Sequence, residues 1–250
     1  MREENKIHYD WFKKNQKFFK REFRDYVNNV LNCINMSPGT VEDLDRVYPL
    51  MQSQFPANEL KSKEKLAGLI ADKKYILYVT KNKIHDTEEN KIHNTEEIIA
   101  YAFVYVLNNH KAIWLDYLAV SDKYQDKGYG TLLFDHVMST VGGGDYDVFL
   151  EVDIPENKND RSAPENRRIR FYEKLGAKKV LGLKYSLPTE KGSMPLYLYF
   201  RPNRNADFID KELFTGVINE VMGNVHSDLP SMPQVRDEVI KNINTADIKL

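Results

Sequence analysis

The chain has 250 residues, and 42% of them are hydrophobic, which is enough apolar material for a packed core and argues against disorder along the whole chain. The 36 Lys and Arg residues nearly balance the 37 Asp and Glu residues, so the net charge is −1 and nucleic-acid binding is not expected as the main function, because phosphate neutralisation needs a basic surplus. A disulfide framework needs cysteine pairs and Cys33 is the only cysteine; neither a secretory leader nor an apolar run of membrane-spanning length is visible, so we expect a cytoplasmic protein.

The first predicted element is an amphipathic helix over residues 11–34, within an N-terminal extension over residues 1–35. Its apolar and mostly aromatic side chains recur with the helical period: Phe12, Phe19, Phe23, Tyr26, Val27, Val30 and Ile34. Lysine and arginine side chains occupy the adjoining sector. We expect the aromatic face to pack on the body of the protein or on a second subunit, as in a homodimer. The less favoured alternative is a basic helix that touches an anionic membrane or RNA.

Two more helices are predicted before the first strand. A break at residues 37–39 (Ser-Pro-Gly) precedes a helix that starts after Thr40, a good N-cap residue, with Asp43 in the place of the capping-box partner. This helix ends before Pro56, and residues 61–72 form the second helix.

Three strands are predicted next, over residues 75–81, 98–108 and 111–120. Between the first two, the segment NKIHDTEE at residues 82–89 is followed by its near copy NKIHNTEE at residues 90–97. This duplication is polar, and we expect it in a hairpin connection, where little backbone is buried. A metal site at its two histidines is not expected, because a duplicated solvated turn explains both.

The second half of the chain alternates between helical and strand patterns. The predicted helices cover residues 130–141, 167–175 and 207–222. The predicted strands cover residues 147–154, 177–185 and 195–201, and a proline-interrupted tail fills residues 229–250. Two of the connections are long enough for right-handed parallel crossovers. The pattern predicts a mixed α/β fold.

One turn in this order carries a chemical signal. The strand that ends at Val120 is followed by Gln125-Asp126-Lys127-Gly128-Tyr129-Gly130 and then by a helix. Glycines at such a turn let backbone amides point into one concavity, and the helix dipole adds to their effect, so the turn suits a phosphate or pyrophosphate. Two glycines alone also fit a simple tight turn, and neither the Rossmann nor the Walker pattern is matched.

This run, taken with a second one, resembles the GNAT superfamily of acetyl-CoA-dependent N-acetyltransferases. The family motif Arg/Gln-x-x-Gly-x-Gly/Ala stands here as residues 125–130, and Arg170-Phe171-Tyr172-Glu173-Lys174-Leu175-Gly176-Ala177 is similar to the second family signature. The resemblance covers about residues 35–201. It implies a mostly antiparallel mixed sheet with a central splayed parallel strand pair and helices on both faces, in a domain over residues 36–202 that is followed by a helical tail over residues 203–250.

The resemblance also implies a site for acetyl-CoA as cosubstrate, with no metal. The pantetheine arm is expected along Leu118, Ala119 and Val120. The pyrophosphate is expected on the turn and first helical residues: Gln125, Asp126, Lys127, Gly128, Tyr129, Gly130 and Thr131. The thioester is then expected where the strands over residues 117–120 and 150–153 part.

In the reaction that the resemblance implies, Tyr172 protonates the leaving thiolate, although a tyrosine flanked by Phe171 and Leu175 also fits a core position. The base is expected among carboxylates near the gap, and we rank Glu151 first. The further candidates are Asp116 and Asp153, followed by Glu59. Strand carboxylates have an alternative role, as ion-pair partners of Arg167, Arg168 or Arg170.

One departure from the family concerns an asparagine that often contacts the cofactor seven residues before the tyrosine. Glu165 stands at that place, and Asn166 comes one residue late, so this contact is not carried over. The expected activity is acetyl transfer to a primary amine of a small molecule or peptide. The alternative is a non-catalytic acyl-CoA-binding regulatory or interaction module.

Overall fold

The structure is a computed structural model that describes residues 34–73, 75–86, 93–243 and 247–250. The helix expected over residues 11–34 lies outside the described residues except for Ile34, so its packing stays a prediction. Among the described residues, no helix has the length and apolar character needed to cross a membrane.

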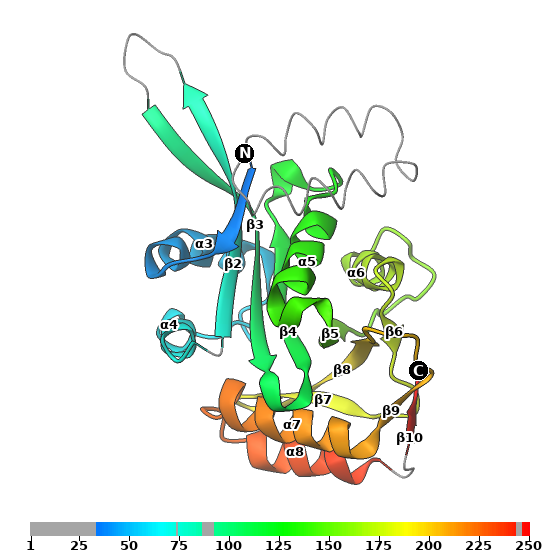
Figure 1. Ribbon diagram of the computed structural model, residues 1–250. Coiled ribbons are helices and arrows are strands. Elements are labelled where there is room, and N and C mark those ends of the chain that lie inside the picture. The colour runs from blue at the N-terminus through cyan, green and yellow to red at the C-terminus, as the bar shows by residue number, and fades with distance from the viewer. Residues whose placement is uncertain (1–33, 74, 87–92, 244–246) are drawn as a thin grey trace.

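An eight-stranded sheet forms the centre of the molecule (Figure 1). Its strands are β1 (Ile34–Pro38), β2 (Tyr75–Asp86), β3 (His93–Leu107), β4 (Ala112–Val120), β5 (Asp147–Asp153), β6 (Lys178–Lys179), β7 (Tyr185–Thr189) and β8 (Gly192–Arg201). The order is β1-β2-β3-β4-β5-β8-β6, and β7 also pairs with β8. Among the described strands of this sheet, β4 and β5 run parallel, and every other neighbouring pair is antiparallel. This confirms the predicted mixed sheet with one parallel pair.

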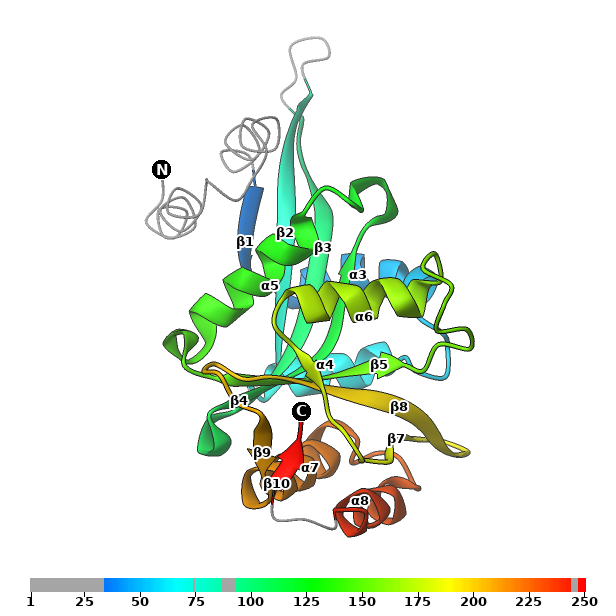
Figure 2. The same cartoon turned by 90° about the vertical axis from the view of Figure 1, so that its right-hand side faces the viewer.

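Six α-helices of the described residues cover the two faces of the sheet. They are α3 (Val41–Gln54), α4 (Lys63–Ala71), α5 (Tyr129–Thr140), α6 (Pro164–Lys174), α7 (Lys211–Val225) and α8 (Met232–Lys241). Apolar side chains of α5 and α6 join one buried cluster with the sheet, and those of α3, α4, α7 and α8 join another. Figure 2 shows α5 and α6 in front of the sheet and α3 and α4 behind it. Helices therefore lie on both faces, as predicted.

The predicted start of α3 is confirmed in detail. The hydroxyl of Thr40 accepts a hydrogen bond from the backbone N–H of Asp43 at 3.3 Å, and the Asp43 carboxylate accepts one from the backbone N–H of Thr40 at 3.1 Å. Two of the otherwise unpaired amides at the helix start are satisfied in this way. The same carboxylate lies 2.7 Å from the ammonium group of Lys81, which ties α3 to β2.

Several segments differ from the sequence-based expectation; the strand predicted over residues 177–185, for example, is replaced by the short β6 and by β7, which begins only at Tyr185. Residues 34–38 were expected to run from the end of a helix at Ile34 into a break at residues 37–39, but they form the edge strand β1, which pairs antiparallel with β2. The strand ends at Pro38, where a proline costs no inner ladder bond. The duplicated segment lengthens the hairpin: β2 continues to Asp86, β3 begins at His93, and these two residues pair. Because one copy pairs with the other, the insertion extends the ladder, and the hairpin projects beyond the body (Figure 1).

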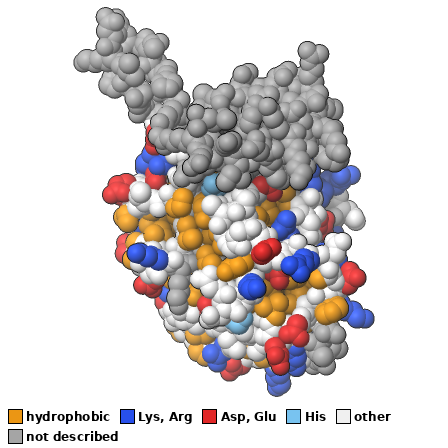
Figure 3. Space-filling view, viewed as in Figure 1, with side chains coloured by type: hydrophobic (Ala, Val, Ile, Leu, Met, Phe, Trp, Pro, Cys, Tyr) orange, Lys and Arg blue, Asp and Glu red, His pale blue; other side chains and the backbone are white. Residues whose placement is uncertain are grey.

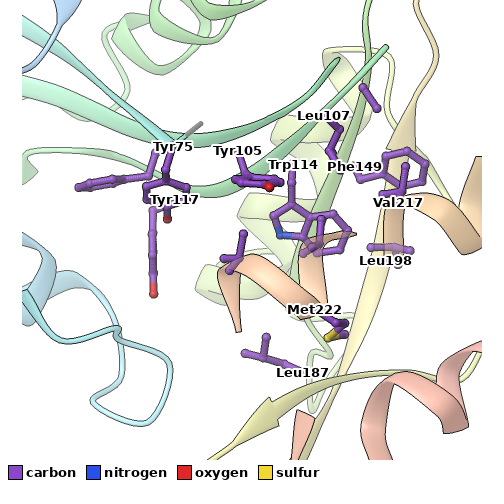
Figure 4. Close-up of a cluster of buried hydrophobic side chains, with 14 of the residues drawn as sticks. Tyr75, Tyr105, Leu107, Trp114, Tyr117, Phe149, Leu187, Leu198, Val217 and Met222 are labelled. Carbon is purple, nitrogen blue, oxygen red and sulfur yellow. The ribbon is translucent and has the colours of Figure 1, made fainter. Parts of the chain in front are cut away.

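The C-terminal segment packs on the same sheet. A short strand, β9 (Phe208–Asp210), precedes α7 and pairs with β10 (Asp247–Lys249). Phe214 and Val217 of α7 are fully buried in one cluster with Trp114 and Phe149 of the sheet. Figure 4 shows Val217 beside Phe149, with Trp114 next to them. Residues after 202 thus complete the core beneath the sheet.

Candidate active site

The parallel strands β4 and β5 separate halfway along their length. They pair from Ala112 with Asp147 to Leu115 with Leu150, and beyond that point no residue of β4 pairs with β5. On the other side of β4 the register shifts, because Phe103 opposes Tyr117 while its neighbour Val104 opposes Leu115. The extra residue of this bulge is Asp116, and a bulge bends its strand and increases its local twist. The gap predicted between the strands therefore begins at Asp116.

The turn from β4 into α5 starts the helix at a glycine N-cap, which has no side chain to accept from the amides of the first helical turn. Asp126 and Gly128 both have positive φ angles, of 59° and 85°, and Gly128 is the N-cap of α5 without a side-chain cap hydrogen bond. The first turn of α5 holds no acidic residue. A Cβ atom at Gly130 would lie 3.3 Å from Cζ of Phe171, so this glycine allows α5 and α6 to approach closely. Such a turn provides an anion site at a helix N-terminus.

The turn forms one end of a cleft of about 560 Å³ between α3, the end of β4, α5 and α6. Nine of the ten residues predicted to bind the cofactor line this cleft: Leu118, Ala119, Val120, Gln125, Asp126, Gly128, Tyr129, Gly130 and Thr131. Lys127 does not line it; its ammonium group donates to the carbonyl oxygen of Lys123 at 2.7 Å. The sequence reasoning missed Gln54, whose amide donates to the carbonyl oxygen of Val120 at 2.9 Å.

A second and smaller pocket, of about 70 Å³, opens where β4 and β5 part. We call it the acceptor pocket; its ionisable lining residues, apart from tyrosines, are Glu59, Lys61, Asp116, Glu151, Asp153 and Arg168. Four residues line both the cleft and the acceptor pocket: Phe55, Leu118, Arg168 and Tyr172. The two spaces therefore adjoin at these four residues, of which Tyr172 is one.

Tyr172 is 8% exposed, which agrees with a packed position on α6. Burial raises the pKa of its hydroxyl to about 12, against the smaller opposing effect of the nearby Arg168 guanidinium. The phenol therefore keeps its proton at neutral pH. Within the described part of the chain, its hydroxyl makes no hydrogen bond, so this proton is not committed to another residue.

Two of the candidate bases are engaged in ion pairs. The ammonium group of Lys61 lies 2.8 Å and 3.1 Å from the two oxygens of the Asp116 carboxylate, which also accepts a hydrogen bond from Tyr75. Asp153 forms an ion pair with Arg168 on α6. For Asp153 this is the ion pair with Arg168 that the sequence offered as the alternative, whereas Asp116 pairs with Lys61, a partner that the sequence analysis did not name.

The other two carboxyls have no cationic partner at ion-pair distance among the described residues. Burial raises the pKa of Glu151 to about 8; the hydrogen bond from Tyr185 opposes the rise, and the Asp116 charge adds to it. Burial, together with the negative charge of Asp153, raises the pKa of Glu59 to about 7. Both carboxyls therefore exchange protons near neutral pH, as a general base requires.

The loop that carries Glu59 is held by the bulge. The hydroxyl of Tyr117 donates to the carbonyl oxygen of Glu59 at 2.7 Å and accepts from the backbone N–H of Lys61 at 3.2 Å. Asp116 and Tyr117 both reach toward the loop, because the bulge turns two successive side chains to one face of the sheet. No local motif in the sequence marks Lys61, since this contact joins residues that are 55 positions apart.

His226, at the end of α7, also reaches this region. It is buried, and its ring and the carboxylates of Asp116 and Glu151 each place one ligand-type atom within 4.8 Å of the others. We assign no metal to this group, because the Lys61 ammonium already neutralises Asp116. Burial is the largest single effect and lowers the pKa of Lys61, but Asp116, Tyr117 and Glu151 together outweigh it, so the net shift is upward and the ammonium stays charged.

The side chain of Asn166 has a structural role. It is buried, and its amide donates to the carbonyl oxygens of Asn157 and Asp160, both at 2.8 Å. The side chain thus fixes the loop between β5 and α6, in keeping with the departure seen in the sequence.

Comparisons with known proteins find a matching family model and similar folds. Residues 77–176 match the family model described as the acetyltransferase (GNAT) domain. A GNAT-family protein from Bacteroides thetaiotaomicron has a similar fold, with a TM-score of 0.56 at 18% identity over 76% of this chain and 97% of that chain. No curated protein matches the sequence.

Two further solved structures are similar at lower TM-scores. The ribosomal-protein-S18-alanine N-acetyltransferase from Escherichia coli has 21% identity over 69% of this chain and 96% of that chain, with a TM-score of 0.48. NAA60 from Arabidopsis thaliana, solved in complex with acetyl-CoA, has 17% identity over 67% of this chain and 97% of that chain, with a TM-score of 0.49.

Proposed function

Because residues 77–176 belong to the GNAT acetyltransferase superfamily, we propose that the chain transfers an acetyl group from acetyl-CoA to a primary amine of a small molecule or peptide. The observation that carries this proposal is that the cleft and the acceptor pocket adjoin at residues that include Tyr172. A donor and an acceptor that enter from opposite sides would come together there, beside a phenol that keeps its proton. We assign the reaction to residues 36–202 and a supporting role to residues 203–250.

The cleft suits acetyl-CoA at both of its ends. At the turn, the N-cap Gly128 has no side chain that competes for the amides of the first helical turn, and a helix N-terminus of this kind favours a pyrophosphate oxygen. Along residues 116–120, the edge of β4 that faces β5 has no strand partner, and an extended pantetheine chain can add to such an edge by backbone hydrogen bonds. These two features support acetyl-CoA as the donor.

The reaction needs a base and an acid, and the acceptor pocket provides both. We assign the base to Glu151, which accepts the proton that the amine loses as its nitrogen bonds to the acetyl carbon. We assign the acid to Tyr172, which donates its proton to the sulfur as the carbon–sulfur bond breaks. The pKa of Glu151, raised to about 8, lies closer to the pKa of an alkylammonium group, about 10.4, than that of an ordinary carboxyl does. The smaller difference favours transfer of the proton from the amine to Glu151.

A panel of primary amines with acetyl-CoA tests the proposal, with free thiol and the mass of the acetylated product as readouts. We expect amine-dependent thiol release and a matching product. If acetyl-CoA raises the melting temperature but no amine is acetylated, the chain is instead a non-catalytic acyl-CoA-binding module. A cytoplasmic location and a homodimer remain predictions.

A further inference from the structure

The charges of the acceptor pocket do not balance. Four carboxyls and two cationic groups line it, and both cations are used in ion pairs: Lys61 with Asp116 and Arg168 with Asp153. Among the described residues, Glu59 and Glu151 remain without a cationic partner at ion-pair distance. A buried or half-buried carboxyl favours a positive charge nearby, because burial has removed the water that would otherwise stabilise its negative form.

Glu59 is the more accessible of these two carboxyls. Its side chain is half-buried and, within the described residues, takes part in no hydrogen bond or ion pair. Its backbone is fixed, since Tyr117 donates to its carbonyl oxygen and Lys61 anchors the next turn of the loop. The pocket therefore holds a carboxyl in a fixed place that has no hydrogen-bond or ion-pair partner among the residues that the structure describes.

We propose that the acceptor carries a second positive charge, and that Glu59 binds the ammonium group that is not acetylated while Glu151 serves the amine that is. The inference rests on the proposed acetyl transfer and names its acceptor as an aliphatic diamine. Acceptors with a carboxylate are disfavoured, because neither Lys61 nor Arg168 is free to pair with it.

Three acceptors of equal length test the proposal: putrescine, the analogue in which one amine is a hydroxyl, and the analogue in which one amine is a carboxylate. The measured quantity is kcat/KM for acetylation, halved for putrescine because its two amines are equivalent. We expect putrescine to exceed the amino alcohol roughly 10- to 100-fold, the range of one charge-assisted hydrogen bond, and the amino acid to be the poorest.

The variant Glu59→Gln tests the assigned residue, because it keeps the shape of the side chain and removes its charge. We expect the ratio of putrescine to amino alcohol to fall to about 1. The matched control is Glu156→Gln, an exposed carboxyl on the loop after β5, which should keep the wild-type ratio. A retained acetyl-CoA thermal shift in both variants verifies that each is folded.

The outcomes separate this inference from the proposed function. Equal kcat/KM for putrescine and the amino alcohol in the wild type overturns the inference and leaves acetyl transfer standing. A preference for putrescine that Glu59→Gln retains overturns the role of Glu59. If none of the three acceptors is acetylated while another amine of the panel is, the diamine assignment fails; if no amine is acetylated, the transferase proposal fails with it.

Discussion

The ammonium group of Lys61 lies 2.8 Å from Oδ2 of Asp116, in a place where the two side chains are only 10% and 4% exposed. This pair joins the loop between α3 and α4 to the bulge in β4, where the two parallel strands begin to separate. The wall of the acceptor pocket thus depends on an internal salt bridge. On the face shown in Figure 3, by contrast, charged side chains of both signs are interspersed at the surface.

Lys61→Met should be strongly destabilising, because it leaves the Asp116 charge buried without its partner. We expect a loss of about 3–5 kcal/mol in the free energy of unfolding, measured with urea. Adding Asp116→Asn removes the stranded charge and should recover most of that loss. A single variant within ~1 kcal/mol of the wild type would contradict the buried pair.

The glycines of the turn are expected to be essential for binding acetyl-CoA. Gly128→Val places a β-branched residue at a positive φ, and Gly130→Val drives a side chain against Phe171, so both should abolish the thermal shift given by acetyl-CoA. Gly68→Ala is the matched control, because a Cβ atom there meets nothing within 4 Å. Unchanged shifts in both valine variants would refute the assignment of the turn.

The raised pKa of Glu151 has consequences for activity and stability. As the base, Glu151 works only when deprotonated, so kcat/KM should rise with pH up to about 8, and Glu151→Gln should lose most activity. The Glu151 carboxyl keeps its proton up to a pH of about 8 in the folded chain but only up to about 4.5 in the unfolded chain. The stability that this proton contributes is therefore fully present below pH 4.5 and is lost as the pH rises through 8. Urea unfolding at several pH values should show a weaker loss in Glu151→Gln. A pH profile of kcat/KM that is flat from 6 to 9 would rule out Glu151 as the base.

His226 should make the fold sensitive to acid. Burial, and then the positive charges of Lys61 and Lys65, hold its pKa well below the usual 6.5, so the folded chain keeps it neutral. Below about 6.5 the unfolded chain binds a proton that the folded chain does not, and stability falls with falling pH. His226→Phe should make this fall less steep between pH 6.5 and 5 in thermal melts. An unchanged slope would mean that other groups cause the acid sensitivity.

Local patterns in the sequence predict much of the fold, and contacts between distant residues explain most of what they miss. Residues that lie close together in the sequence predict the capping box of Thr40 and Asp43. They also predict the glycine turn and the helix that follows it. β1 was missed because five residues that end in a proline gain strand structure only by pairing with β2. Spacing places Asp116 on a parting strand, but the bulge that turns it toward Lys61 depends on the register with β3.

The same limit applies to the ranking of the bases. Strand alternation places Glu151 and Asp153 on one face, yet Arg168 of α6 neutralises the second, and Tyr185 of β7 donates to the first. Glu59, which does not lie on either of the two parting strands, was ranked last. Tyr117, 58 residues away, fixes that loop.

The most direct test of the account is the turnover of Tyr172→Phe. The ring still packs, so the fold and the affinity for acetyl-CoA should change little, while kcat should fall by roughly 10²–10⁴-fold, the range for a lost general acid. The loss should shrink with a donor whose thiol is more acidic, because that leaving group needs less help. Near-normal kcat on an acceptor that the wild type acetylates would contradict the account and return Tyr172 to a packing role.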